Sequence, residues 1–66
     1  MHLMINGQAR DLAGTPTITD VLAQMGHARG TVSVAINETF VPRSLYDEAT
    51  LDEGDRVDIV APQQGG

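Results

Sequence analysis

The residues with the clearest chemical potential are the two glycines that end the sequence, Gly65 and Gly66. If an oxygen of a terminal carboxylate attacks the α-phosphate of ATP, the resulting acyl-adenylate has a good leaving group and reacts with sulfur or nitrogen nucleophiles. The chain end must then enter the nucleotide site of another protein, and glycine has no Cβ that would collide with the walls of a narrow channel. The ending therefore indicates that the Gly66 carboxylate is the reacting group and that the protein is a cosubstrate, not an enzyme. The alternative is an ordinary frayed chain end.

The rest of the sequence offers little to an enzyme mechanism. It has no cysteine, and hence no thiol nucleophile and no thiolate metal ligand. Its two histidines, His2 and His27, fall on the outward face of a predicted strand and in a loop, where a surface role is favoured over catalysis. The acidic residues between Asp47 and Asp58 lack the spacing of a calcium loop, and no glycine-rich phosphate-binding pattern is present. We therefore expect this chain to bind no cofactor and no metal.

Length and charge limit the class of protein and of partner. The 66 residues allow one small domain, and nine acidic side chains against four arginines and no lysine give a formal net charge of -5. This charge argues against nucleic acid, which requires a basic surface, and favours a basic protein partner. No stretch is long and apolar enough for a membrane span or a signal peptide, so we expect no membrane contact and a cytoplasmic protein.

Alternation of apolar residues predicts five strands, in the order strand, strand, helix, strand, strand, strand. Asn6-Gly7 is the dipeptide preferred in type I′ turns and predicts a hairpin at the start of the chain. Pro42 cannot donate a hydrogen bond to a neighbouring strand, so the fourth strand is predicted at an edge of the sheet. The predicted strands span residues 1–6, 8–12, 31–37, 38–44 and 56–61.

A short amphipathic helix is predicted after Thr17. Thr17 is a favourable N-cap, and Asp20 stands three residues later in the position of a capping box. Gly26 is placed to end the helix. The apolar stripe follows the spacing i, i+3, i+4 and i+7 and consists of Ile18, Val21, Leu22 and Met25.

These elements make an α+β domain. One helix can cover only one face of a sheet, so the other face is expected to meet water or a partner. We expect the domain to span residues 1–61 and a flexible tail to span residues 62–66. The predicted core consists of Met1, Leu3, Ile5, Leu12, Ile18, Val21, Leu22, Met25, Val32, Val34, Ile36, Leu51, Val57 and Ile59.

Several segments together carry a family resemblance. They are "NGQARDL", "TITDVLAQMG", "AINETFVPRS", "LDEGDRVDIV" and the ending "APQQGG". With their spacing, the chain resembles over its whole length the ThiS family, the small sulfur carrier proteins of thiamine biosynthesis, which have the ubiquitin-like β-grasp fold. "VPRS", "GDRVDIV" and the terminal glycines are the most specific part.

The resemblance implies a mixed sheet of four to five strands that grasps one helix, with the first and last strands parallel and central. It implies that the glycine at position 66 is adenylylated by an E1-like adenylyltransferase that uses ATP and magnesium, and is then converted to a thiocarboxylate. A sulfur donor protein would supply the sulfur, and thiazole synthase would receive it to build the thiazole ring. Gly65 would help the chain end to thread into these partners.

Three other functions remain open at this point. The small subunit of molybdopterin synthase is similar in fold, ending and activation chemistry, but is usually longer. A ubiquitin-like protein modifier is the second alternative. The absence of lysine excludes self-conjugation through side-chain amines, and the absence of cysteine excludes transport of sulfur as a persulfide on this chain. The third alternative is a β-grasp binding module without any chemistry at its tail.

A docking surface for partners is expected on the sheet face opposite the helix. Alternation directs Met4 and Val60 to that face. Because the family places the first and last strands side by side, we expect Met4 next to Val60, with Ala35 and one of Phe40 or Val41 nearby. A contiguous apolar patch beside a reactive tail indicates a docking surface rather than ordinary surface.

Overall fold

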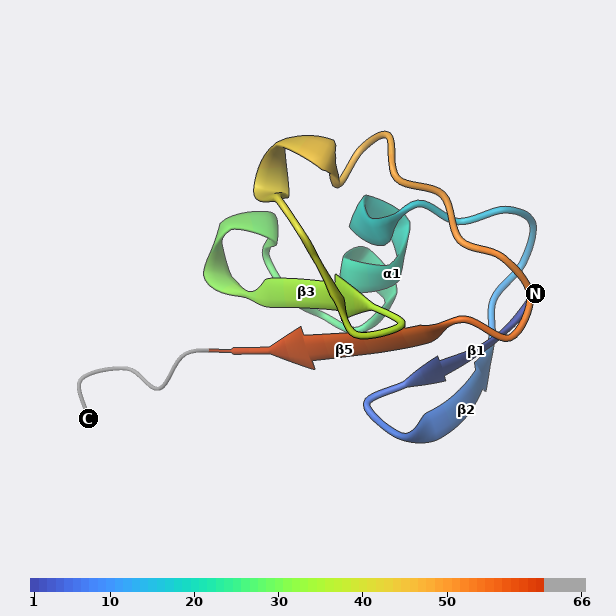
Figure 1. Ribbon diagram of the computed structural model, residues 1–66. Helices are drawn as coiled ribbons and strands as arrows, with labels where there is room; N and C mark the ends of the chain where they lie inside the picture. Colours follow the sequence, from blue (N-terminus) through green and yellow to red (C-terminus); the bar gives the residue numbers. More distant parts are fainter. Residues whose placement is uncertain (62–66) are drawn as a thin grey trace.

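The structure of the protein is a computed structural model that describes residues 1–61 (Figure 1). A five-stranded sheet packs with one face against a single helix, which is the predicted α+β architecture. Two short 3-10 helices, at Arg29–Thr31 and Arg43–Leu45, were not predicted. The strands and the helix are β1 (His2–Ile5), β2 (Gln8–Asp11), α1 (Ile18–Gln24), β3 (Ser33–Ile36), β4 (Thr39–Val41) and β5 (Arg56–Val60).

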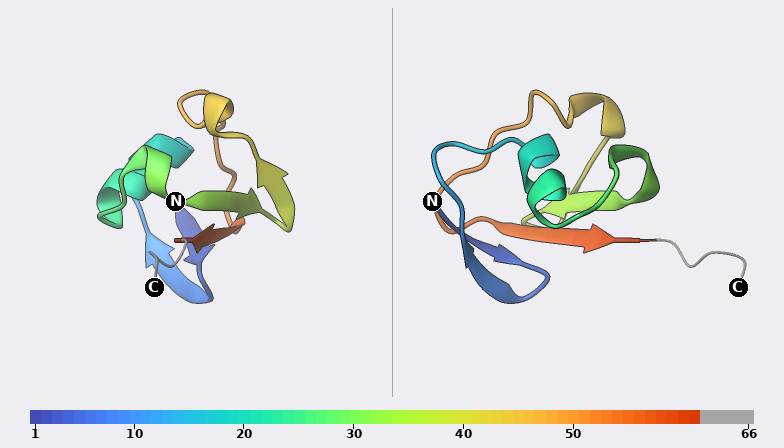
Figure 2. Two further views of the ribbon diagram at one scale, coloured as in Figure 1. Left: turned by 90° about the vertical axis from the view of Figure 1, so that its left-hand side faces the viewer. Right: turned by 180° about the vertical axis from the view of Figure 1, so that it is seen from behind.

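The sheet has the strand order β2-β1-β5-β3-β4. β1 and β5 lie side by side and parallel, and the other neighbours are antiparallel, so the first and last strands form the middle of the sheet as expected. Figure 2 shows β5 running between the β1–β2 hairpin and β3 when the molecule is turned. β4 lies at one edge, which agrees with the position predicted from Pro42.

α1 begins and ends at the predicted signals. The Thr17 hydroxyl accepts a hydrogen bond from the Asp20 amide (3.3 Å), and the Asp20 carboxylate accepts one from the Thr17 amide (3.0 Å). This reciprocal capping box satisfies two amides that the first turn leaves without a helical partner. Gly26 follows with φ 79°, a left-handed conformation that glycine adopts without steric cost. Within residues 1–61 no helix is long and apolar enough to cross a membrane.

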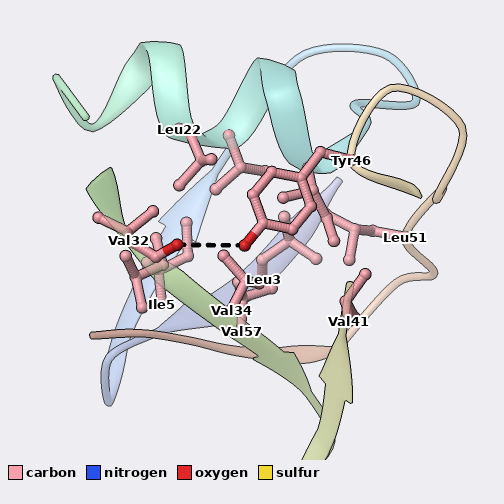
Figure 3. Close-up of a cluster of buried hydrophobic side chains, with 12 residues drawn as sticks. Leu3, Ile5, Leu22, Val32, Val34, Val41, Tyr46, Leu51 and Val57 are labelled. Carbon is pink, nitrogen blue, oxygen red and sulfur yellow. Dashed lines mark hydrogen bonds between the residues drawn. The ribbon is translucent and has the colours of Figure 1, made fainter. Parts of the chain in front are cut away.

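The core lies between α1 and the sheet (Figure 3). Ten of the predicted core residues are buried, while Met1, Leu12, Met25 and Ile36 are only partly buried against them. Two residues of the buried hydrophobic cluster were not in the predicted core, Val41 and Tyr46. The buried set is Leu3, Ile5, Ile18, Val21, Leu22, Val32, Val34, Val41, Tyr46, Leu51, Val57 and Ile59.

Tyr46 is the largest of these side chains and comes from the chain after the 3-10 helix at Arg43–Leu45. Its ring lies between α1 and the sheet, and its hydroxyl donates a hydrogen bond to the Val32 carbonyl (3.3 Å; Figure 3). A buried tyrosine requires such a partner, because an unpaired hydroxyl in the core would be costly. Tyr46 therefore ties the irregular segment before β5 to the entry of β3.

Candidate functional site: the open face of the sheet and the end of β5

The face of the sheet that points away from α1, here called the open face, carries the predicted docking residues. Strand alternation places buried and exposed side chains on opposite faces, so that Leu3 and Ile5 point to the helix while Met4 points away. Phe40 and Val60 are the most exposed large apolar side chains, at 65% and 63%. The open face is formed by Met4 of β1, Ala35 of β3, Phe40 of β4, and Arg56, Asp58 and Val60 of β5.

Ala35 connects Phe40 and Val60 on this face. Ala35 pairs directly with Phe40 on one side and with Asp58 on the other. Val60 stands two residues beyond Asp58 and is therefore a diagonal neighbour of Ala35, within reach of side-chain contacts across strands. These three residues form one apolar patch, which we name the Phe40 patch. Val60 lies at the end of β5 from which the chain continues to the glycines, whereas Ala35 and Phe40 lie level with Asp58.

Met4 does not lie beside Val60, so that expectation from the sequence is wrong. The parallel register pairs Met4 with Arg56 instead. Val60 is four residues further along β5, which at about 3.3 Å per residue places it roughly 13 Å away. Arg56 and Asp58 thus separate Met4 from the Phe40 patch. The face of each residue was predicted correctly, but the register was not.

The region between Met4 and the Phe40 patch is polar. Met4, Gly7, Arg56 and Asp58 line a shallow hollow on the open face. The Arg56 guanidinium lies 3.6 Å from the Glu38 carboxylate, and both side chains are largely exposed. Arg56 and Asp58 thus lie between Met4 and the Phe40 patch. Such a surface can bind a partner that has polar groups opposite these two charges.

Metal-ligating and polar side chains are dispersed over the described part of the chain. Within residues 1–61, no group of three histidine, cysteine, aspartate or glutamate side chains is close enough to hold an ion. In the same part of the chain no polar or charged side chain is buried, and no buried side-chain polar atom lacks a partner. The predicted reacting residue Gly66 and its neighbour Gly65 lie outside the described residues.

The sequence reasoning missed one contact at the end of β5. The side-chain oxygen of Asn6 accepts a hydrogen bond from the Ile59 amide (2.7 Å). The Asn6-Gly7 dipeptide predicts a turn but not this contact, in which the Asn6 side chain bonds to the last strand. The signal that points to this contact is the choice of asparagine: it tolerates positive φ as glycine does, but it also carries an acceptor.

Comparison with known proteins shows to which family the sequence is similar. The sequence model of the ThiS family matches residues 3–66, so the match includes both glycines. A sulfur carrier protein ThiS from Thermus thermophilus is 37% identical over 62 residues, which is 94% of this chain and 95% of that protein. A thiazole synthase from Paramagnetospirillum magneticum is 35% identical over 66 residues; the match takes in all of this chain but only 20% of the synthase. The chain thus spans about a fifth of the length of that relative.

Solved structures of the same family have a similar fold. The crystal structure of a thiamine biosynthesis protein (ThiS) from Geobacter metallireducens superposes with a TM-score of 0.82 at 28% sequence identity, and the match covers 100% of both chains. The mixed five-stranded sheet with one helix is therefore the ubiquitin-like β-grasp fold. Because the family match extends over nearly the whole chain, the protein belongs to the ThiS family.

Proposed function

We propose that this protein is a sulfur carrier for thiamine biosynthesis. The observation that carries the proposal is that the ThiS family match runs to residue 66 and so includes the glycine whose carboxylate would react. The relative from Thermus thermophilus is named a sulfur carrier protein. The protein acts as a cosubstrate: it presents its chain end to enzymes that hold the catalytic groups.

The chemistry proceeds in two steps at Gly66. An oxygen of the carboxylate attacks the α-phosphate of ATP in the site of an E1-like adenylyltransferase, pyrophosphate leaves, and the magnesium held by that enzyme offsets the charge of the phosphates. A hydrosulfide ion supplied by a sulfur donor protein then attacks the acyl carbon, so that a carbon–sulfur bond forms, the carbon–oxygen bond to the phosphate breaks, and AMP leaves. The product is a thiocarboxylate, whose sulfur is nucleophilic without help from a neighbouring base. ATP and magnesium belong to the activating partner, and this chain binds neither.

Thiazole synthase is the proposed acceptor of the sulfur. The support is the thiazole synthase of Paramagnetospirillum magneticum, since a region similar to this whole chain forms part of that protein. Two activities that share one polypeptide in a relative often act together when they are separate proteins. The acidic surface, with a formal charge of -5, suits a basic surface around the entrance of each partner's site.

The Phe40 patch is the proposed docking surface for these partners. Phe40 and Val60 are exposed on the open face, and Val60 ends β5, from which the chain continues to the glycine that would react. Aromatic side chains that become buried on binding commonly supply much of the affinity of an interface. Met4 then contacts the partner at a second, separate point beyond Arg56.

The test is adenylylation of the purified chain, measured by intact mass after incubation with ATP, magnesium and an E1-like adenylyltransferase. We expect one AMP on the wild-type chain, localised to the C-terminal peptide. Deletion of Gly66 should leave the thermal midpoint unchanged but reduce adenylylation by ~100-fold or more, because even about 1 Å of misplacement at a reacting centre has that effect. Gln64→Ala is the matched control and should remain active.

Two results would contradict the proposal. One is a folded chain without Gly66 that still accepts AMP at its end. The other is sulfur that maps to any position other than Gly66 when a sulfur donor is added. Formation of conjugates with lysines of other proteins as the main product would instead assign the chain to the ubiquitin-like modifiers.

A further inference from the structure

β5 is held unequally by its two neighbours. On one side β3 pairs with it from Val57 to Val60. On the other side β1 pairs only with Arg56 and Val57, because the chain then turns away into the β1–β2 hairpin. β5 consequently runs past the tip of this hairpin, as both Figure 1 and Figure 2 show. The last part of β5 therefore lacks a neighbouring strand on the β1 side.

Asn6 supplies the missing bond at this point. Its backbone amide donates to the Val57 carbonyl (2.9 Å), and its side-chain oxygen accepts from the Ile59 amide (2.7 Å). In a parallel ladder one residue of the neighbouring strand commonly makes both bonds through its backbone amide and carbonyl. Here the side-chain oxygen of Asn6, and not its backbone carbonyl, accepts the bond from the Ile59 amide. The ladder thus continues one step beyond the end of β1.

A second asparagine bonds to β5 at its opposite end. The Asn37 amide donates to the Arg56 carbonyl (2.8 Å), and its side-chain oxygen accepts from the Arg56 amide (3.0 Å). Asn37, like Asn6, occupies the first position of a two-residue hairpin turn, and their φ angles are 49° and 51°. The two residues are thus matched in type and conformation, and each accepts a β5 amide through its side-chain oxygen. They differ in place, since only Asn6 lies near the end of β5 that leads to Gly66, and in that the Asn37 side-chain amide also donates to the Asp55 carboxylate (3.0 Å).

We propose that Asn6 is a positioning residue for the reaction at Gly66. This inference rests on the proposed function. Ile59 lies opposite Val34 of β3 on one side and donates its amide to Asn6 on the other, and the chain that follows must enter the active site of a partner. With Asn6 in place, the patch residue Val60 follows a strand segment that is contacted on both sides up to Ile59. Without it, β3 alone holds this end, and the partner must order it on binding, which lowers the rate of a correctly aligned attack.

Three substitutions distinguish the effect of the Asn6 side-chain oxygen from the effect of the turn conformation. Asn6→Gly keeps positive φ favourable and removes the acceptor, whereas Asn6→Asp keeps both an acceptor and tolerance of this conformation. Asn37→Gly makes the same deletion at the far end of β5. Asn6→Ser, whose hydroxyl is too short to reach Ile59, is used in place of the glycine variant if that variant does not fold.

The first measurement is amide hydrogen exchange of the full chain. We expect Asn6→Gly to lose about tenfold or more of the protection of the Ile59 amide, since the bond that protects it is deleted. Asn37→Gly should lose protection at the Arg56 amide and retain it at Ile59. Asn6→Asp should resemble the wild type at both amides. Unchanged protection of Ile59 in Asn6→Gly would overturn the proposal without reference to any enzyme.

The second measurement is kcat/KM for adenylylation, calculated with the concentration of folded protein. We expect kcat/KM to decrease about tenfold in Asn6→Gly. In Asn6→Asp and in Asn37→Gly we expect it to stay within about threefold of the wild-type value. A purely structural role would lower the thermal midpoint of both glycine variants and leave both rates alike. Equal rates in the two variants, with the wild type active, would overturn the positioning role alone. A wild-type chain that accepts no AMP would overturn the proposed function, and the positioning role with it.

Discussion

The two faces of the sheet come from the same strands and yet have opposite properties. On β5, Val57 and Ile59 are buried under α1, while Val60, the next residue, is 63% exposed. On β4, Val41 is buried and its neighbour Phe40 is exposed. The difference arises from the single helix, which covers one face and leaves the other open. Stability and partner binding are therefore expected to depend on separate sets of residues that alternate along the chain.

The largest expected effect is loss of packing on the covered face. Leu22→Ala removes a side chain of α1 that is 1% exposed and should lower the free energy of unfolding by about 2–5 kcal/mol. A domain of this size has roughly 3–10 kcal/mol in total, so the change is severe. Urea denaturation followed by circular dichroism measures it. Met4→Ala on the open face is the control. If it lowered the free energy of unfolding as much as Leu22→Ala, the two faces would not differ in their contribution to stability.

The next effect is expected on the open face and in binding alone. Phe40→Asp introduces a charge into the Phe40 patch and should weaken binding to the activating enzyme at least tenfold, or about 1.4 kcal/mol, while the free energy of unfolding changes by less than ~0.5 kcal/mol. Isothermal titration calorimetry and urea denaturation measure the two quantities. Leu45→Asp changes another exposed apolar residue, on the 3-10 helix that lies on the α1 side of the sheet (Figure 1). Equal weakening by both variants would show that the open face is not the docking surface.

The smallest effect is expected in the turn between β3 and β4 and should leave both faces unchanged. Glu38 has φ 72°, which is unfavourable for a residue with a side chain. Glu38→Gly should raise the free energy of unfolding by about 0.5–1 kcal/mol, since glycine adopts this conformation freely. The exposed contact with Arg56 that is lost contributes little. A lower thermal midpoint in differential scanning calorimetry would contradict this, and Gly7→Ala, the reverse change in the other hairpin, should be destabilising.

Local sequence signals predicted most of the elements because each depends on residues close together in the chain. Alternation predicted the covered face of β1, β3 and β5, and Thr17 with Gly26 predicted the limits of α1. For β4 the same rule could not decide between Phe40 and Val41, since a strand of three residues offers too few alternations. The structure buries Val41 and exposes Phe40.

The features that were missed depend on residues far apart in the chain. Tyr46 lies in a segment without periodicity, and its burial follows from contacts with α1 and β3 that no local pattern specifies. The register of β1 on β5 sets Met4 beside Arg56, and nothing in either strand alone determines this offset. The bond from Ile59 to Asn6 likewise spans most of the sequence. Asparagine at the turn indicated the conformation of the hairpin, but not the strand that its side chain would reach.

The parallel pair in the middle of the sheet has a consequence for synthesis of the protein. Met4 and its partner Arg56 are 52 residues apart (56 minus 4), so a ribosome that adds about 5–20 residues per second makes the second strand roughly 3–10 s after the first. Until then β1 can form only its hairpin with β2, and the centre of the sheet is the last part to close. A nascent chain that stops before β5 therefore leaves β1 and β3 with unpaired edges, which makes it a target for chaperones and proteases. Completion of the fold thus reports that synthesis has passed β5.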